Sequence, residues 1–203
     1  MNQWNTSLAC LALAWAAWAG WHSLLARPGV ERLLRSRLAL SRPAYRLAYS
    51  LLSLLTLAPV AAYARSLGGL RGGWWPGGWV ALQMGMGLAG WGLLLWAWRS
   101  LRREGVDLLG WRELRRDLAP PPRLVTTGAY ALSRHPMYLG AALALWARGT
   151  SPADLVTNLA LTLYLALGAW HEESRLRTLF GPSYRTYARR VPFLLPLGRR
   201  RSG

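Results

Sequence analysis

The sequence predicts an all-α fold, a polytopic membrane helix bundle of about five transmembrane helices with a cytoplasmic C-terminal region. Three observations lead to this prediction. The 203 residues are 53% hydrophobic and include 13 tryptophans, several uncharged runs reach membrane length, and the arginines gather in alternate connections between those runs. The single cysteine, Cys10, excludes a disulfide-stapled secreted domain. A disordered basic tail is also excluded, because it would lack so much Trp and Leu.

Four apolar runs are clear, and they cover residues 4–26, 47–64, 79–98 and 155–170. The first contains no charged residue and is long enough to cross a hydrocarbon core of ~30 Å at ~1.5 Å per residue. The third is rich in glycine, which favours close helix packing in lipid. Its glycines are Gly85, Gly87, Gly90 and Gly92. Each run is therefore expected to form a membrane helix.

A further crossing, between the third and the last run, is less regular. The twelve residues 136–147 are too short to span a bilayer alone. Extending the segment back to Gly128 makes it long enough, but then Arg134 and His135 lie inside the membrane boundary. Polar side chains there are costly, so these two residues are candidates for function.

The basic residues predict the topology. All 25 are arginine, against eight acidic residues, and 22 of them fall in segments 27–46, 99–135 and 171–203. By the positive-inside rule these segments are cytoplasmic and the N-terminus is outside. The formal net charge of +17 is then explained by topology and by attraction to anionic membrane lipids. We expect no nucleic-acid partner, because the arginines form no binding face interleaved with aromatic residues.

The composition also indicates a source. Lysine is absent and Ala, Leu, Gly and Trp are abundant, which is typical of a GC-rich bacterial genome. We therefore expect an integral protein of the bacterial inner (cytoplasmic) membrane.

The first motif that could support chemistry runs from Gly128 to Gly140 and contains Arg134-His135-Pro136. Pro136 can open a helix, so His135 would stand at a helix start, where free N–H groups can hold an anion. Arg134 adds donors suited to a carboxylate. The alternative is an interfacial cap on a membrane helix.

Two more motifs follow the last apolar run. In His171-Glu172-Glu173-Ser174-Arg175-Leu176 the carboxylates either bind ribose hydroxyls or an ammonium, or they pair with nearby arginines. The segment from Phe180 to Pro192 has tyrosines three residues apart between arginines, a pattern typical of an amphipathic membrane anchor. Three histidines and one cysteine show no metal-ligand spacing, so no metal is predicted.

Taken together, these motifs resemble the integral-membrane methyltransferases related to isoprenylcysteine carboxyl methyltransferase and the phospholipid methyltransferases. The resemblance covers about residues 106–196. The N-terminal half is similar to a narrower branch, the methanethiol S-methyltransferases and NnrU-like proteins. The residues that indicate this branch are His22 to Ala26, Tyr45 to Leu47 and, most tellingly, Asp107-Leu108-Leu109-Gly110-Trp111-Arg112.

The resemblance implies S-adenosyl-L-methionine as methyl donor, bound in a cytoplasm-facing pocket of the C-terminal half. It also divides the chain into N-terminal membrane helices with three crossings, 1–105, and a methyltransferase-like region, 106–203, with two further helices and a cytoplasmic tail. Carried over by position, the cofactor-binding residues are Arg123, Leu124, Val125, Tyr130, His135, Pro136, Met137, Tyr138 and Glu172, to which the guanidinium chemistry of the motif adds Arg134. Of these, Arg134 and the 135–138 backbone would hold the methionine end, and Glu172 the ribose or ammonium.

The methyl acceptor and the general base remain open. Isoprenylcysteine enzymes place a substrate-binding Arg at the position of Gly168, so its absence favours a small thiol such as methanethiol. A lipid or isoprenylcysteine-type acceptor is the alternative. Glu173 and His171 are the nearest candidates for a base. A rival hypothesis is a non-enzymatic, haem-binding NnrU-like protein in which His22 is an axial ligand.

Overall fold

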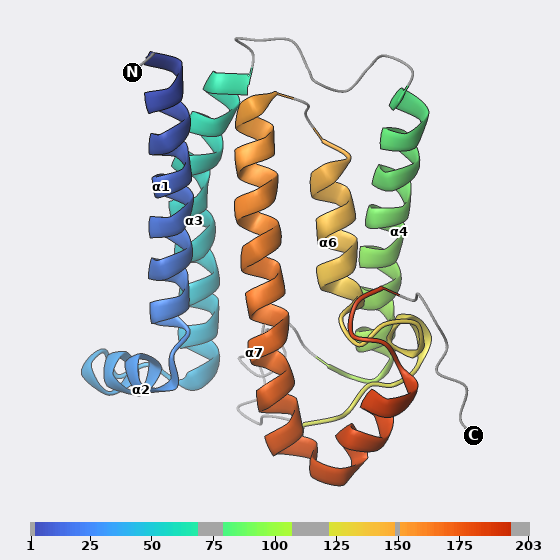
Figure 1. Ribbon diagram of the computed structural model, residues 1–203. Helices are drawn as coiled ribbons and strands as arrows, with labels where there is room; N and C mark the ends of the chain where they lie inside the picture. The colour runs from blue at the N-terminus through green and yellow to red at the C-terminus, as the bar shows by residue number, and fades with distance from the viewer. Residues whose placement is uncertain (1–2, 69–78, 107–121, 149–150, 196–203) are drawn as a thin grey trace. The chain divides into compact units, whose positions relative to one another are not determined.

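The computed structural model describes residues 3–68, 79–106, 122–148 and 151–195 (Figure 1). All regular elements within these ranges are helical, which confirms the predicted all-α fold. In chain order they are α1 (Gln3–Leu25), α2 (Pro28–Arg37), α3 (Arg42–Gly68), α4 (Val80–Arg103), the 3-10 turn η2 (Gly128–Ala131), α6 (Pro136–Trp146) and α7 (Pro152–Arg190). The family-like motif 107–112 lies outside the described residues.

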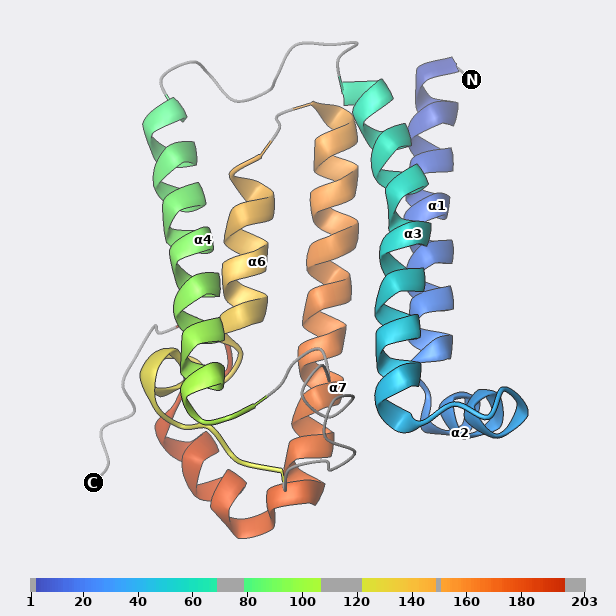
Figure 2. The same cartoon turned by 180° about the vertical axis from the view of Figure 1, so that it is seen from behind.

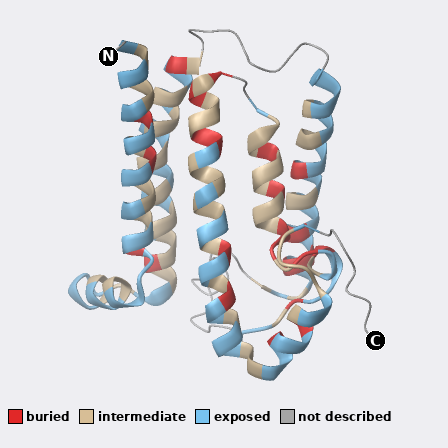
Figure 3. Ribbon diagram, in the orientation of Figure 1, coloured by how far each residue is buried: buried red, intermediate tan, exposed pale blue. Residues whose placement is uncertain are grey.

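Four helices, α1, α3, α4 and α7, are long and apolar enough to cross a membrane. They contain the four predicted apolar runs, except that Ala26 and Trp79 lie one residue outside α1 and α4. Much of their length is exposed (Figure 3). The exposed residues include large apolar ones, among them Leu88 at 75%, Trp91 at 67% and Trp170 at 70%. Such surface is unfavourable in water but suits contact with lipid tails. These features confirm the predicted polytopic membrane bundle.

The irregular crossing forms α6, an apolar helix of 11 residues that begins at Pro136. The backbone before Pro136 does not continue this helix, because Gly128–Ala131 forms the separate turn η2. Arg134 and His135 therefore precede the first turn of α6 and do not lie within one long helix that starts at Gly128. At ~1.5 Å per residue α6 rises about 16 Å, less than the ~30 Å hydrocarbon core.

The described residues form two compact units. One consists of residues 3–68 and 151–160, and the other of residues 79–106, 122–148 and 161–195. The predicted boundary between residues 105 and 106 stays a prediction.

In the first unit, α1 and α3 are antiparallel and connected through α2. The Tyr63 hydroxyl donates to the Ser7 carbonyl at 3.3 Å, and the Tyr45 hydroxyl donates to the Leu25 carbonyl at 2.7 Å. The N-terminal part of α7 joins them where Trp15 Nε1 donates to Thr157 Oγ1 at 3.0 Å. Polar side chains thus link the helices of this unit.

His22 is engaged at both ring nitrogens in this unit. Its Nδ1 lies 2.8 Å from Ser53 Oγ, and its Nε2 contacts the Tyr49 hydroxyl. Because the Ser53 hydroxyl donates to the Tyr49 carbonyl at 2.7 Å, Ser53 Oγ accepts from Nδ1–H and Nε2 accepts from Tyr49. A haem-ligand role for His22 would require one of these hydrogen bonds to break.

In the second unit, α4 packs antiparallel against α6 at very short range. A Cβ placed on Gly90 would lie 2.6 Å from Ala144 N, and one on Gly140 would lie 2.9 Å from Gly90 O. A Cβ on Gly87 would meet Ala147 Cβ at 3.4 Å. Glycine at these positions lets the two backbones touch, as small residues do between membrane helices.

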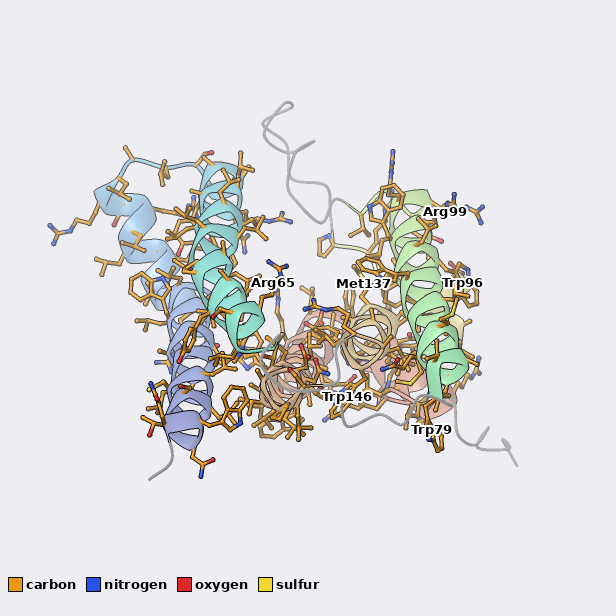
Figure 4. The ribbon with its side chains drawn as sticks, turned by 90° about the horizontal axis from the view of Figure 1, so that it is seen from above. Arg65, Trp79, Trp96, Arg99, Met137 and Trp146 are labelled. Carbon is orange, nitrogen blue, oxygen red and sulfur yellow. The ribbon has the colours of Figure 1, made fainter. Side chains whose placement is uncertain are left out.

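In the same unit, α6 lies between α4 and the rest of α7 (Figures 1 and 2). Trp146 reaches from α6 toward α7 (Figure 4), and its Nε1 donates to Thr162 Oγ1 at 2.9 Å. At the opposite end of the unit, Arg123 Nη1 donates to Glu104 O at 3.4 Å and Arg134 pairs with Glu173. The arginine-rich residues from 99–106, 122–135 and 171–190 therefore meet at one end of the unit.

Candidate functional site

The turn before α6 is docked onto α4 by a glycine. Gly128 has φ +61°, and a Cβ there would lie 2.2 Å from Ser100 Oγ. The same oxygen accepts from Ala129 N–H at 3.2 Å. One residue earlier, Thr127 Oγ1 donates to Glu104 Oε1 at 3.1 Å. These contacts fix η2 against the C-terminal end of α4. They thereby restrict the position of the backbone that leads from η2 to Arg134.

Backbone hydrogen bonds then place the start of α6. Arg134 N–H donates to the Pro192 carbonyl at 3.0 Å, and His135 N–H donates to Ser133 Oγ at 3.2 Å. His135 is the N-cap and Pro136 the first helical residue, as predicted. The first N–H bonded back to the N-cap is that of Leu139, which reaches the His135 carbonyl at 3.0 Å. The amides of residues 137 and 138 therefore precede the first intrahelical bond.

Glu173 is the centre of the site, and its residue is 2% exposed. Its Oε2 accepts from Arg134 Nη1 at 2.6 Å and from Arg177 Nη2 at 3.1 Å. Its Oε1 lies 3.0 Å from His135 Nε2 and accepts from the Tyr184 hydroxyl. These five residues are called the Glu173 cluster below. Both carboxylate oxygens are shared between two donors, and the arginine charges favour the ionised form.

Glu172, the neighbouring carboxylate, has a different environment. Its side chain is 41% exposed, and its Oε2 lies 3.7 Å from His135 Nδ1, which is an ion-pair distance too long for a hydrogen bond. The Tyr138 hydroxyl interacts with the same carboxylate. Glu172 is thus half-exposed and less fully paired than Glu173, so its carboxylate can accept further hydrogen bonds.

Arg134 also retains an unused donor. Its Nε is buried and has no hydrogen-bond partner within the described part of the chain, although Nη1 is paired with Glu173. The guanidinium carbon lies 5.5 Å from the centroid of the Phe193 ring, a cation–π distance. A buried donor without an acceptor costs about 1–3 kcal/mol. A ligand oxygen beside Arg134 would remove this cost.

The segment that follows α7's apolar part folds back onto this site. Gly181 has φ +52° within α7 and breaks the helix direction there. Beyond it, the Tyr187 hydroxyl donates to the Tyr130 carbonyl at 2.7 Å. Burial raises the pKa of the Tyr130 hydroxyl, with smaller contributions from Glu172 and Tyr187, so this hydroxyl stays protonated and can donate.

The sequence similarities agree with this geometry. The chain is 32% identical over 186 residues to methanethiol S-methyltransferase 2 of Bradyrhizobium diazoefficiens, a match that covers 86% of the chain and 68% of that relative. The chain belongs to the methanethiol S-methyltransferase family. This membership confirms the resemblance predicted from the motifs.

Two further matches cover shorter stretches of the chain. The chain is 35% identical over 119 residues to methanethiol S-methyltransferase of Pseudomonas deceptionensis, over 56% of this chain and 45% of the relative. It is 40% identical over 82 residues to protein-S-isoprenylcysteine O-methyltransferase of Schizosaccharomyces pombe, over 36% and 33%. The chain thus spans less than half the length of the Pseudomonas deceptionensis relative that it matches. No family model and no solved structure matches the chain.

The structure gathers only part of the site predicted for this family member. Arg134, His135, Tyr138, Glu172 and Glu173 lie together, and Tyr130 is linked to them through Tyr187. Within the described ranges, the other predicted site residues have no hydrogen bond or ion pair to the Glu173 cluster. Arg123 and His171 are exposed, Leu124 and Met137 are half-buried, and Val125 and Pro136 are buried. Among the described residues, no group of three His, Cys, Asp or Glu side chains is placed to hold a metal ion.

Three contributors were not predicted as site residues. Tyr184 and Tyr187 were interpreted as parts of a membrane anchor, but both are buried, at 0% and 7% exposure. Phe193 packs its ring against His135, with centroids 4.9 Å apart. Gly181 is the sequence feature that could have identified the two tyrosines as site residues. A glycine there can adopt a positive φ and turn the chain back toward Glu173.

Proposed function

We propose that this protein is an integral-membrane S-adenosyl-L-methionine-dependent methyltransferase whose acceptor is a small thiol such as methanethiol. The observation that supports it best is the Glu173 cluster, which holds Arg134 and His135 beside the half-exposed carboxylate of Glu172. Family membership supports the same reaction class. We further propose that this end of the protein faces the cytoplasm of a bacterial inner membrane, where its arginines contact anionic lipids.

The donor groups of the site fit the proposed cofactor. The unpaired Nε of Arg134 and the amides of residues 137 and 138 suit the carboxylate of its methionine end. The Glu172 carboxylate suits its ribose hydroxyls or its ammonium group. When bound, S-adenosyl-L-methionine supplies a methyl group activated by a positive sulfonium.

Methyl transfer to a thiol needs little covalent chemistry from the protein. The residues bind and orient the reactants, which is a positioning effect. The arginines at this end of the unit favour the thiolate form of a thiol acceptor, which is the nucleophile. Glu173 is a poor candidate for a general base, because its two oxygens are already shared among four donors. His171 is exposed and apart from the cluster.

A small acceptor is supported by the contact between Tyr138 and Gly168. A Cβ on Gly168 would lie 3.4 Å from Tyr138 Cε1 and 3.8 Å from its hydroxyl oxygen. The tyrosine ring therefore covers α7 one helical turn before Glu172. Among the described residues, the Tyr138 ring fills the space beside Gly168, and position 168 itself has no positive side chain to pair with an acceptor carboxylate.

The proposed function is tested by isothermal titration of S-adenosyl-L-methionine into the purified protein. Glu172→Gln is expected to weaken binding about tenfold or more, because a hydrogen bond to a charged group contributes about 1.5–3 kcal/mol. Glu31→Gln is the matched control, since Glu31 pairs with Arg35 and Arg42 in the first unit. Wild-type protein that shows no binding would contradict the proposal.

The acceptor is tested by product analysis with methanethiol, with the expected product dimethyl sulfide. Methylation of a lipid or isoprenylcysteine-type acceptor without methylation of methanethiol would reject the small-thiol proposal and retain the reaction class. Methylation of neither class, in protein that binds the cofactor, would reject both acceptors.

Substitution of Gly168 tests the Tyr138 contact. Gly168→Ala should keep methanethiol methylation, because its Cβ meets Tyr138 at an ordinary contact distance. Gly168→Leu should lower the rate about tenfold or more, since overpacking that displaces the ring costs about 1–3 kcal/mol. Equal rates in the two variants would show that methylation of the acceptor does not depend on the contact between Tyr138 and Gly168.

A further inference from the structure

We propose that Tyr184 is a positioning residue of this site, which orients Arg134 and His135 by holding the carboxylate of Glu173. This inference rests on the proposed function, because the group that Arg134 and His135 serve is the proposed cofactor. Tyr184 lies outside the Gly128–Gly140 motif that contains Arg134 and His135. The sequence predicts that its own segment, Phe180 to Pro192, is a membrane anchor.

The two oxygens of the Glu173 carboxylate bind different partners. One oxygen, Oε2, accepts from the two guanidinium groups of Arg134 and Arg177. The other, Oε1, faces His135 Nε2 and the Tyr184 hydroxyl. Since the Tyr184 hydroxyl is a fixed donor at Oε1, it opposes rotation of the carboxylate toward the arginines. His135 and Arg134 are thereby held on opposite oxygens of one group.

Burial leaves the Tyr184 side chain little freedom to adopt another position. Its residue is 0% exposed, and its ring lies edge-on to Tyr187, with centroids 5.8 Å apart. Tyr187 in turn is hydrogen-bonded to the Tyr130 carbonyl. The two tyrosines therefore connect the 182–190 helix to both sides of the site, at Glu173 and at η2.

The chain changes direction at Gly181, and this brings Tyr184 back to Glu173. Glu173 and Tyr184 are 11 residues apart, which in a straight helix would separate them by about 16 Å along the axis. They are in contact because Gly181 adopts φ +52° and turns the chain back. An added Cβ on Gly181 would meet no atom within 4 Å, so glycine is required there for its conformation and not for space.

The residues that follow α7 are hydrogen-bonded to the segment just before α6. The Pro192 carbonyl accepts from Arg134 N–H at 3.0 Å, and the Phe193 carbonyl accepts from Ser133 Oγ at 3.3 Å. The Phe193 ring contacts both His135 and the Arg134 guanidinium. Phe193 thus restrains the Arg134 and His135 side chains by ring contacts, and Tyr184 restrains them through the Glu173 carboxylate.

The test compares Tyr184→Phe with the matched variant Tyr45→Phe. Tyr45 is also buried and donates its hydroxyl to a carbonyl at 2.7 Å, but it lies in the first unit. Both variants keep the ring and lose one buried hydroxyl, so they control for loss of stability. Titration calorimetry measures the Kd for S-adenosyl-L-methionine, methyl transfer gives kcat and KM, and thermal unfolding gives Tm.

Tyr184→Phe is expected to raise Kd and the cofactor KM about tenfold with kcat changed less than about twofold. Tyr45→Phe is expected to leave Kd unchanged at a similar loss of Tm. An unchanged Kd in Tyr184→Phe would overturn the inference, and so would an equal rise in Tyr45→Phe. If Tyr184→Phe fails to fold, Tyr187→Phe is measured instead, and an unchanged Kd there overturns it. Failure of the proposed function is distinguishable, because wild-type protein would then bind no cofactor.

Discussion

Glu173→Leu is expected to destabilise the protein by about 3–5 kcal/mol, the loss typical of breaking a buried ion pair from one side. The change leaves Arg134, whose side chain is 12% exposed, without its carboxylate at 2.6 Å. It also leaves His135 and the Tyr184 hydroxyl without their acceptor. The measurement is unfolding of the purified protein in mixed micelles by denaturing detergent, followed by circular dichroism.

Glu172→Leu is the matched control for this prediction, because it removes the adjacent carboxylate on the same helix. The Glu172 side chain is 41% exposed, and its one charge partner among the described residues is a protonated His135, with Oε2 3.7 Å from Nδ1. We expect its stability to change by less than about 1 kcal/mol, in the range of exposed ion pairs, while cofactor binding is lost. Equal stability of the two variants would refute the structural role of Glu173.

The two carboxylates illustrate what the sequence can and cannot specify. The Glu172-Glu173 pair was recognisable as a candidate from its place after the last apolar run. Which of the two is buried could not be predicted, because neighbouring helical residues point about 100° apart and the choice depends on where the Arg134 turn docks. That docking is a tertiary contact with Pro192, far along the chain.

The membrane helices were predicted well because lipid imposes a length on each apolar run. Their ends were predicted less well. The run 155–170 lies within α7, which continues to Arg190. Hydropathy reports the part suited to lipid, whereas the helix continues through charged residues that are good helix formers. The reversal at Gly181 was missed for the same reason, since no change of hydropathy marks it.

The glycine-rich run of α4 determines how closely α4 packs against α6. Gly90→Ala is therefore expected to lower the stability of the protein strongly. An alanine Cβ would lie 2.6 Å from Ala144 N and 2.8 Å from Gly140 O. Both are backbone atoms, so no side chain can move aside and the helices must separate. Overpacking of this kind costs about 1–3 kcal/mol, and separation also removes close contacts that stabilise helix pairs in lipid.

Gly92→Ala provides the control on the same helix, because a Cβ there meets no atom within 4 Å. Alanine is the better helix former by about 1 kcal/mol, so this variant should be neutral or slightly more stable. Detergent unfolding should therefore move in opposite directions for the two variants. Since α6 carries Pro136 directly after Arg134 and His135, Gly90→Ala should also weaken cofactor binding, while Gly92→Ala should not. Unfolding of both variants at the same detergent fraction would show that the close α4–α6 contact does not determine the stability of this unit.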